Sequence, residues 1–315
     1  MKCSVIIRSF NEEKHIKRLL KAVFMQELPG GYEVILVDSG SNDQTLKIAS
    51  EHPVKIIHIN KENFSFGYSL NQGIRAASGQ FCAFVSAHCY PANAEWLSSL
   101  LEPFEDEKIA LVYGRQVGNH VTKYSEKQIF SKWFPPESVR RQRSSFCNNA
   151  NAAIRRALWE KNQFNEVLTG LEDLAWAQQM LEQGYFISYN ATAVIFHLHE
   201  ETYSQIFNRY KREAITLHSI LKESKFTFLD LVKLSCMNIA VDYLHAIRDR
   251  EILKCFLSIP CFRLAQFYGT YQGYKFRKTI TQELRDRFYY PTQYRRKNPE
   301  PVAEEINLAC KSEIL

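Results

Sequence analysis

The sequence lacks several features that would assign it to a familiar class. Its eight cysteines form no C-x-x-C pair, and no spacing of histidine and cysteine matches a zinc module. Charged residues interrupt every apolar stretch near the C-terminus, so none predicts a membrane-spanning helix. No signal peptide is expected, because the opening apolar run meets charge at Arg8. Cysteines within apolar runs, such as Cys82, favour reduced thiols and a cytoplasmic protein.

Charge is also modest and is not gathered into a dense basic block, so nucleic acid is not the expected partner. The net charge is +6 and the sequence pI is about 8.8. This excess suits a nucleotide diphosphate, a phosphorylated lipid carrier or an anionic membrane surface. An ordinary soluble surface with a few extra lysines would carry the same charge. Hydrophobic residues make up 45% of the chain, as in a packed globular protein.

Short apolar runs alternate with helical patterns over the first hundred residues. Strands are predicted at 4–7, 33–37, 54–59 and 81–85, and helices at 12–25, 45–50 and 69–77. This order predicts an α/β fold with a mostly parallel sheet and helices on both faces. Ligands of such sheets bind beyond the carboxyl ends of the strands. The loops that would converge on a bound nucleotide are 8–12, 38–43, 60–68 and 86–91.

The rest of the chain changes character twice. Residues 120–150 are irregular and predict a long surface loop or short helices. A helix is predicted at 172–183, followed by a short strand at 194–196. The chain after Tyr203 is predicted to be helical, with no glycine-rich linker. The predicted organisation is therefore one domain over 1–202, with halves 1–90 and 91–202, and a C-terminal helical extension over 203–315.

Several segments, in the right order, resemble the inverting glycosyltransferases of family 2, which have the GT-A fold. The segments are 4–13 (SVIIRSFNEE), 37–45 (VDSGSNDQT), 70–79 (LNQGIRAASG) and 170–173 (GLED) with Gly184 and Tyr185. The subgroup described as rhamnosyltransferase-like is the most similar, because of Phe64-Ser65-Phe66-Gly67 and Ser86-Ala87-His88. The resemblance covers residues 4–200.

The resemblance implies an enzyme of the hexosyltransferase type. It would move a sugar from a UDP-, dTDP- or GDP-sugar to a saccharide or lipid-linked acceptor hydroxyl, with inversion. Surface polysaccharide or glycolipid assembly is the implied setting, in the cytoplasm or at the inner face of the membrane. Two alternatives remain open at this stage: a catalytically inactive nucleotide-sugar or carbohydrate-binding protein, and a nucleotidyltransferase. The latter would need a glycine-rich phosphate loop, and residues 8–13 contain no glycine.

Inverting transfer needs a base that takes the proton of the acceptor. The resemblance assigns that role to Asp173, with Glu172 orienting it or contacting the acceptor. The N-terminus of the predicted helix would keep Asp173 ionised. The alternative is that both acids only cap the helix.

The resemblance also implies a set of residues around the donor. Asp38 would accept a hydrogen bond from the nucleobase, and the main chain at Ser9 and Asn11 would frame the base and ribose. The remaining candidates for the nucleotide are Glu12, Arg75 and Ser86, and those for the donor sugar or diphosphate are His88, Asn148, Asn149 and Arg155. Arg75 could equally face solvent. Asp43 is expected to form a turn or helix cap, and a turn would explain the asparagines as well.

The sequence departs from the family after the fourth strand. Most members have Asp-x-Asp there, which binds a divalent metal such as Mn²⁺ or Mg²⁺, and this chain has Ser86-Ala87-His88. Serine is a poor ligand for magnesium, but His88 and His199 could hold manganese or a softer ion. His197 is expected to be a core residue. In a metal-free alternative, His88 and His199 would hold the diphosphate together with arginines, namely Arg140, Arg141, Arg143 and Arg155.

Residues 203–290 combine aromatic and basic side chains, which suits peripheral contact with a membrane. Helix packing with a solvated basic face, or stacking on sugar rings, would explain the same composition. The residues in question are Tyr210, Lys211, Arg212, Phe262, Arg263, Phe267, Tyr268, Tyr271, Tyr274, Lys275, Phe276, Arg277 and Lys278.

Overall fold

The computed structural model describes residues 1–276 and 281–289, and the chain divides into two compact units between Glu200 and Glu201. The sequence pattern placed this boundary between residues 202 and 203. Arg277, Lys278 and the extension after residue 289, including Cys310, lie outside the described residues. The seven cysteines within the described residues are free thiols.

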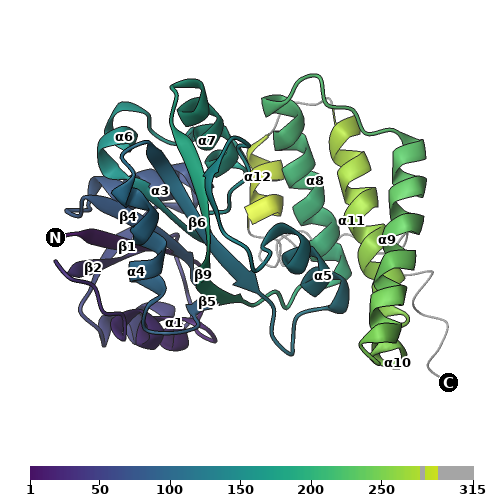
Figure 1. Cartoon of the computed structure of the whole chain (residues 1–315), viewed down its shortest axis with the longest axis horizontal. Helices are drawn as coiled ribbons and strands as arrows, with labels where there is room; N and C mark the ends of the chain where they lie inside the picture. The colour runs from purple at the N-terminus through teal and green to yellow at the C-terminus, as the bar shows by residue number, and fades with distance from the viewer. Residues whose placement is uncertain (277–280, 290–315) are drawn as a thin grey trace. The chain divides into compact units, whose positions relative to one another are not determined.

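The first unit is built on one twisted sheet (Figure 1). Its nine strands in the described residues run in the order β3-β2-β1-β4-β8-β6-β9-β5, with β7 paired to β9. The strands are β1 (Cys3–Ser9), β2 (Tyr32–Asp38), β3 (Val54–His58), β4 (Phe81–Ser86), β5 (Cys89–Pro91), β6 (Ile109–Val117), β7 (Val139–Gln142), β8 (Asn151–Arg155) and β9 (Phe186–His197).

The sheet is parallel in its first half and mixed in its second. Strands β3, β2, β1 and β4 pair in parallel, as the alternating pattern predicted. Strand β8 then pairs antiparallel to both β4 and β6. The segment after Asn148 forms this strand, where the sequence also allowed a turn and helix cap. The α/β class is therefore confirmed, with a mixed sheet in place of a mostly parallel one.

Helices cover both faces of the sheet, as predicted. One face carries α1 (Ile16–Phe24), α2 (Thr45–Ser50) and α4 (Trp96–Leu101), and the other carries α3 (Phe66–Arg75), α5 (Tyr124–Trp133), α6 (Arg156–Lys161) and α7 (Glu172–Glu182). Strand side chains alternate between the two cores, so Val5 and Ile7 pack on one face and Ile6 on the other. Two 3₁₀ turns, Lys61–Asn63 and Glu102–Glu105, complete the unit.

The carboxyl ends of β1, β2 and β4 lie level with one another. Ser9 pairs with Asp38 and Arg8 pairs with Ser86, so the loops that follow these strands start side by side. The loops after β1 and β2 are then joined by hydrogen bonds. The Asn11 N–H donates to the Ser41 hydroxyl at 2.9 Å. This edge of the sheet is where an α/β fold binds its ligand.

The second unit is helical, as predicted. It contains α8 (Tyr203–Ile220), α9 (Phe228–Arg248), α10 (Ile252–Cys255), α11 (Ser258–Lys275) and α12 (Gln282–Tyr289). Helix α11 runs between α8 and α9 (Figure 1). A Cβ added at Gly269 would lie 2.5 Å from the Phe207 carbonyl oxygen, so glycine is what lets α11 approach α8. A buried pair of 2.7 and 2.8 Å hydrogen bonds joins Arg263 of α11 to Asp242 of α9.

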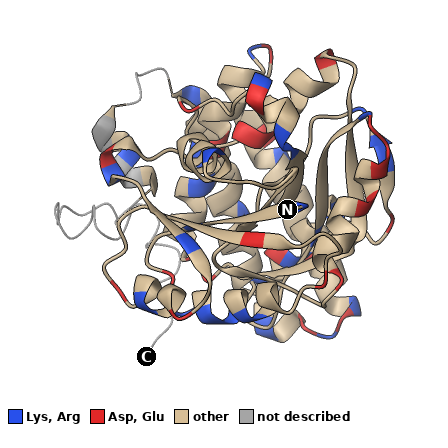
Figure 2. Cartoon of the chain, turned by 90° about the vertical axis from the view of Figure 1, so that its left-hand side faces the viewer, with Lys and Arg blue, Asp and Glu red and all other residues tan. Residues whose placement is uncertain are grey.

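Charged residues of both signs are interspersed over the helices and loops in view in Figure 2. Among the described residues, no helix is long and apolar enough to cross a bilayer.

We predict that Asn71→Ala lowers the free energy of unfolding by about 2–4 kcal/mol, because it removes a buried side chain that forms four hydrogen bonds. The Asn71 amide donates to the Phe164 carbonyl and the Glu166 carboxylate, and accepts from Trp159 and the Phe164 N–H. Denaturant unfolding measures the change. Gln72→Ala on the same helix is the control, with an expected loss under about 1 kcal/mol. Equal losses at the two positions would contradict the prediction.

Candidate active site

Two adjacent carboxylates, Glu172 and Asp173, are buried in the first turn of α7. Leu171 precedes them in the left-handed region, with φ of +55°, which costs roughly 1–2 kcal/mol for a side chain of this kind. The Asp173 carboxylate accepts hydrogen bonds of 2.8 Å from the N–H groups of Asn149 and Leu174. The surrounding structure therefore holds this carboxylate in one orientation.

The pKa of Asp173 is raised to about 7. Burial is the largest cause, and the adjacent Glu172 carboxylate adds to it, because two like charges in a buried site resist ionising together. Hydrogen bonds from Asn149 and Leu174 and the charge of Arg8 act in the opposite direction. The sequence predicted that the helix N-terminus would keep Asp173 ionised. Burial beside Glu172 instead raises its pKa.

Arg8 provides the positive charge beside the acid pair. Its Nη1 lies 3.3 Å from Oε1 of Glu172, and its guanidinium lies over the Phe66 ring, 4.8 Å from the ring centre. The Asn149 side-chain amide also donates to Glu172, at 3.3 Å, and its own side-chain carbonyl oxygen is buried with no hydrogen-bond partner among the described residues. The Glu172 carboxyl group is thus held between the Arg8 guanidinium and the Asn149 amide. A buried acceptor without a partner is also a place where a ligand hydroxyl could donate.

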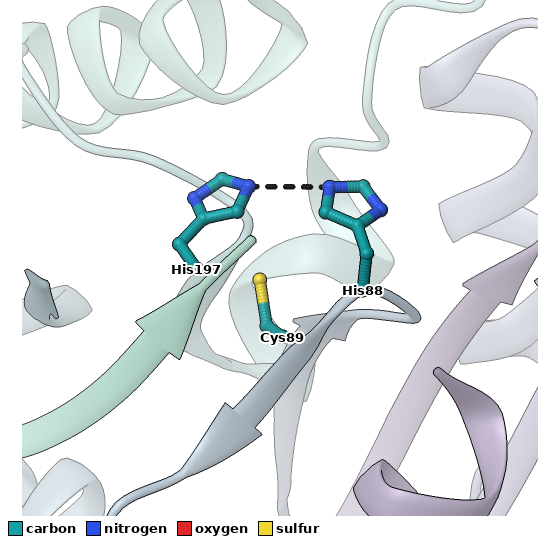
Figure 3. Close-up of side chains that lie close together, drawn as sticks. All are labelled: His88, Cys89 and His197. Carbon is teal, nitrogen blue, oxygen red and sulfur yellow. Dashed lines mark hydrogen bonds between the residues drawn. The ribbon is translucent and has the colours of Figure 1, made fainter. Parts of the chain in front are cut away.

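A pair of histidines forms a second cluster (Figure 3). His88 begins the approach to β5, His197 ends β9, and their Nε2 atoms lie 3.2 Å apart. The opposite nitrogens face acceptors: Nδ1 of His88 lies 3.1 Å from Glu12 Oε1, and Nδ1 of His197 lies 2.7 Å from Gln116 Oε1. If both Nδ1 atoms donate, both Nε2 atoms present lone pairs to each other. Such an arrangement requires a cation or a proton between them.

These residues fit a divalent metal. Two nitrogens bound about 2.1 Å from one ion stand roughly 3.0–3.4 Å apart at ordinary coordination angles, which brackets the spacing of His88 and His197. Metal-binding histidines usually donate their other nitrogen to a carboxylate or carbonyl, and the Nδ1 atoms of His88 and His197 lie against such acceptors, Glu12 and Gln116. Cys89 lies beside them and completes the donor group (Figure 3). Burial and, to a smaller extent, the nearby Glu12 raise the pKa of the Cys89 thiol well above its ordinary value, so the imidazoles are the better ligands.

The structure brings the two C-terminal histidines together beside His88. His199, the expected ligand, has its Nδ1 2.7 Å from Glu126, and its ring centre lies 5.9 Å from that of His88 and 4.0 Å from that of His197. His197, the expected core residue, is buried as predicted but lies directly against His88. The sequence did not show this second contact, because it does not show that β9 ends beside β5. The role of His199 as a metal ligand stays a prediction.

Three groups that were predicted to contact the nucleotide form hydrogen bonds within the protein: the Asp38 carboxylate and the main chain of Ser9 and of Asn11. Asp38 is fully buried, and its carboxylate accepts hydrogen bonds from the hydroxyls of Ser9 and Ser41 and from the N–H groups of Gly40 and Ser41. These four bonds fill its acceptor capacity, so Asp38 shapes the loop and has no acceptor left for a nucleobase. The Ser9 carbonyl accepts from the Ser39 N–H, and the Asn11 N–H is taken by Ser41. The predicted contact of Asp38 with the nucleobase is corrected accordingly, whereas the framing of the base and ribose by the main chain of Ser9 and Asn11 stays a prediction.

Arg75 and Arg155 do not reach the site. Arg75 ends α3, roughly 13 Å along the helix from Phe66, and its guanidinium contacts Gln163 and Glu166. Arg155 pairs with Phe81 at the amino end of β4, and donates to three backbone carbonyls there. The structure contradicts the predicted role of each.

The other arginines of the metal-free alternative are also elsewhere. Arg141 pairs with Asp106 at 2.7 Å, and Arg140 pairs more loosely with Glu102. Arg141 and Arg143 lie over the ring of Phe186, which begins β9 at the opposite end from His197. The arginines that the metal-free alternative needed beside the diphosphate therefore contact other parts of the protein.

The remaining predicted residues lie at the expected edge. Ser86 ends β4 next to Arg8, and Glu12 supports His88. Asn149 joins the acid pair, whereas the Asn148 side chain accepts from the Ala150 N–H and forms the turn.

A model of the family described as Glycosyl transferase family 2 matches residues 4–162, just over half of the chain, so the chain belongs to this family. It is 29% identical over 223 residues to the O-antigen chain rhamnosyltransferase RfbN of Salmonella typhimurium, covering 67% of this chain and 70% of RfbN. It is 30% identical over 189 residues to the O-antigen chain rhamnosyltransferase WbaN of Salmonella anatum, covering 56% of this chain and 60% of WbaN. The expectation of a rhamnosyltransferase-like glycosyltransferase is confirmed over the binding-protein and nucleotidyltransferase alternatives.

The fold is similar to that of the mannosyltransferase PcManGT from Pyrobaculum calidifontis, solved with GDP-Man and Mn²⁺. The TM-score is 0.58 at 18% identity, and the likeness covers 87% of this chain and 84% of that one. The expected GT-A architecture is thereby confirmed.

Three residues of the site escaped the sequence analysis. Arg8 was assigned only to a loop, although a charged residue near the end of a buried strand is a signal for a residue of the site. Gln116 lies one residue before the end of β6, a strand that the sequence pattern did not predict. Glu126 lies in α5, within the segment interpreted as irregular.

We predict that Asp173→Asn stabilises the protein above neutral pH. The folded state binds the Asp173 proton more tightly than the unfolded chain, so the free energy of unfolding falls as pH rises from about 4 to about 7. At about pH 8 the variant should be more stable by roughly 1–3 kcal/mol, with no gain near pH 4. Thermal or denaturant unfolding at the two pH values measures this difference.

Asp43→Asn is the control of opposite sign. Burial alone would raise the pKa of Asp43, but hydrogen bonds from Thr45 and Glu13 outweigh it and lower the pKa. This carboxylate therefore adds stability above its unfolded pKa, and its loss should destabilise the protein at neutral pH. A destabilised Asp173→Asn variant at high pH would refute the assignment of a raised pKa.

Proposed function

We propose that Asp173 is the general base with which this glycosyltransferase activates its acceptor hydroxyl for inverting transfer from a nucleotide-diphosphate sugar. The observation that carries the proposal is the buried acid pair, in which Asp173 has a pKa of about 7. A base with that pKa is about half deprotonated at pH 7 and is strong enough to take the proton. The pair costs stability, and a protein that only binds sugars would gain nothing from it.

Each neighbour of the base has a separate task in this proposal. Glu172 pairs with Arg8 and raises the proton affinity of Asp173. The Asn149 N–H orients the Asp173 carboxylate. The side-chain oxygen of Asn149, which has no partner among the described residues, would accept a hydrogen bond from a hydroxyl of the donor or acceptor sugar. The acceptor oxygen attacks the anomeric carbon, its proton passes to Asp173, and the bond to the diphosphate breaks.

His88 and His197 would hold a divalent metal on the leaving-group side. Their Nε2 spacing and their supports, Glu12 and Gln116, favour such a site. The solved complex of PcManGT with Mn²⁺ supports manganese as the first ion to test. When bound, the ion supplies positive charge to the departing diphosphate. Ser86, next to Arg8, would offer its hydroxyl to the nucleotide.

The nucleoside would bind beside the loops after β2 and β3. An open hollow of about 440 Å³ is lined there by Gly40, Ile59, Asn60, Lys61 and Glu62. Lys61 also lies over the ring of Phe10, with its Nζ 4.7 Å from the ring centre. A hollow with an aromatic ring and an ammonium group at its edge suits a base and ribose joined to phosphate.

The names of RfbN and WbaN make an activated rhamnose the first donor to test, with an O-antigen saccharide as acceptor. A lipid-linked acceptor would place the reaction at the inner face of the membrane. The free thiols in the described part of the chain support a cytoplasmic site of action.

We predict that Asp173→Asn lowers kcat by roughly a thousand-fold, because the acceptor loses its base. Glu172→Gln should retain activity but shift the acidic limb of the kcat profile to lower pH, since the like charge that raises the Asp173 pKa is gone. Initial rates of sugar transfer across pH, with a screen of nucleotide sugars for the donor, measure both. Asp43→Asn controls for loss of an acid near the site. Unchanged turnover in Asp173→Asn would remove it as the base.

We predict that a chelator abolishes transfer and that Mn²⁺ restores it. His88→Ala and His197→Ala should each weaken Mn²⁺ binding by roughly ten-fold or more, measured by calorimetry or electron paramagnetic resonance in the absence of donor. His52→Ala is the control, because His52 stacks on Phe24 away from the pair. Activity that survives chelation, or Mn²⁺ binding unaffected by both variants, would refute the metal site.

A further inference from the structure

Of the four tryptophans, all within the described residues, only Trp133 lies at the surface. Trp96, Trp159 and Trp176 are at most 4% exposed, whereas Trp133, the last residue of α5, is 48% exposed. A single exposed ring is common on protein surfaces. The contacts that hold the ring decide whether it has a use.

Phe146 holds the Trp133 ring in one position. The two rings stack with their centres 4.8 Å apart and their planes inclined by 27°, so the exposed surface of the indole lies on its other face and its edges. Phe146 is itself fixed. Its ring meets the Tyr113 ring edge-on at 5.6 Å, and its carbonyl accepts a 2.7 Å hydrogen bond from the Gln142 amide. A ring that is fixed before a ligand arrives loses little conformational entropy on binding.

The segment that carries Phe146 leads directly to the acid pair. Burial raises the pKa of the Cys147 thiol, and the nearby Asp173 and Glu172 raise it further. Asn149 follows, and its N–H donates to the Asp173 carboxylate at 2.8 Å. Three residues of chain span at most about 11 Å. A short saccharide bound at Asp173 can therefore extend to the rings.

Helix α5 ties Trp133 to the histidine pair as well. Phe130 lies one turn before Trp133 on this helix and stacks on His197, with the ring centres 5.6 Å apart and 16° between the planes. One helical turn corresponds to a rise of about 5 Å. The exposed ring is thus linked by packed side chains to both clusters of the site.

The surroundings of the ring favour a saccharide as its ligand. The exposed residues near it along the chain are mostly polar, namely Ser131, Lys132, Glu137, Ser138 and Ser144. A pyranose has an apolar face of C–H groups and a rim of hydroxyls, so a flat ring with polar neighbours is complementary to it. A protein partner or a membrane would instead be met by a contiguous apolar patch.

The ring is not among those that the sequence composition suggested for stacking on sugars. Phe262, Arg263 and Tyr274, three of the residues considered for that role or for a membrane, are buried in α11 and pack within the second unit. Trp133 belongs to the segment interpreted as irregular, where it ends a helix.

We propose that the outer face of Trp133, backed by Phe146, is a subsite that binds a sugar ring of the acceptor away from the attacked hydroxyl. The proposal rests on the proposed sugar transfer at Asp173. The attacked sugar lies at the acid pair, and a further unit of the acceptor stacks on Trp133. Since this ring does not touch the reacting atoms, it binds the acceptor equally in the ground state and the transition state. It therefore sets the KM for the acceptor and the preferred acceptor length.

The kinetic test compares acceptors of different length. Trp133→Ala should raise the KM for an O-antigen oligosaccharide by roughly ten-fold and leave kcat and the donor KM unchanged. A monosaccharide acceptor ends before the subsite, so its KM should be the same in both proteins. Trp133→Phe keeps a ring and should restore most of the affinity. Met25→Ala, which removes an exposed apolar side chain at the end of α1, on the opposite face of the sheet, is the matched control.

Acrylamide quenching of tryptophan fluorescence tests the subsite without turnover. Because the other tryptophans are buried, the emission that acrylamide quenches comes from Trp133. Binding of a panel of O-antigen oligosaccharides should lower the quenching constant by roughly two-fold or more, because a stacked sugar covers the open face. Asp173→Asn should keep this protection. If no donor supports transfer but the protection is seen, the proposed chemistry fails and the subsite stands.

Three results would overturn the subsite. One is wild-type protein whose quenching no oligosaccharide changes. Another is a KM that Trp133→Ala raises equally for monosaccharide and oligosaccharide acceptors, or that Met25→Ala raises as much. The third is a Trp133 that resists quenching without saccharide, since another copy or the rest of the chain would then cover the ring.

Discussion

The structure of the site depends on one electrostatic constraint: two carboxylates, Glu172 and Asp173, are buried side by side. Neither helix geometry nor the nearby dipole can offset this, because burial removes the water that would stabilise both charges. The charge of Arg8 and the N–H of Asn149 oppose the rise in the pKa of Asp173 but do not cancel it. Strand β1 and the loop before β8 are therefore tied to α7 by charge as well as by packing. The first turn of α7 is held with a left-handed leucine in front of it, so the fold bears strain to keep the pair in place.

The second cluster, His88 and His197, is held by hydrogen-bonding contacts of its outer nitrogens. His88 and His197 are supported from outside by Glu12 and Gln116, so their inner nitrogens converge. The sequence replaces an acid by Ser86 at the position where most of the family places one. In the proposed metal site, the imidazoles of His88, just before β5, and His197, at the end of β9, would take the place of that acid. Neutral nitrogen donors in place of carboxylates favour manganese or a softer ion over magnesium.

Much of the first half of the fold could be predicted from local patterns, because parallel βα units repeat one apolar strand and one amphipathic helix. Strands β1, β2, β3 and β4 and the helix that begins at Glu172 fall close to the predicted ranges. The second half was harder, since β6, β7 and β8 pair through long-range contacts that no short segment encodes. The same limit explains the site. The sequence motif identified Asp173. His197 reaches His88 only because β5 pairs with β9. Arg155 lies at the amino end of β4, away from the site, because β8 pairs antiparallel with β4.

The short stretch from Arg8 to Glu12 supports both clusters. Arg8 reaches Glu172 on the side of the base, and Glu12 reaches His88 on the side of the leaving group. The spacing between these two residues is thus a length constraint on variation. An insertion or deletion between them would separate the support of the acid pair from the support of His88. Natural variants of this enzyme should therefore agree in the length of this stretch.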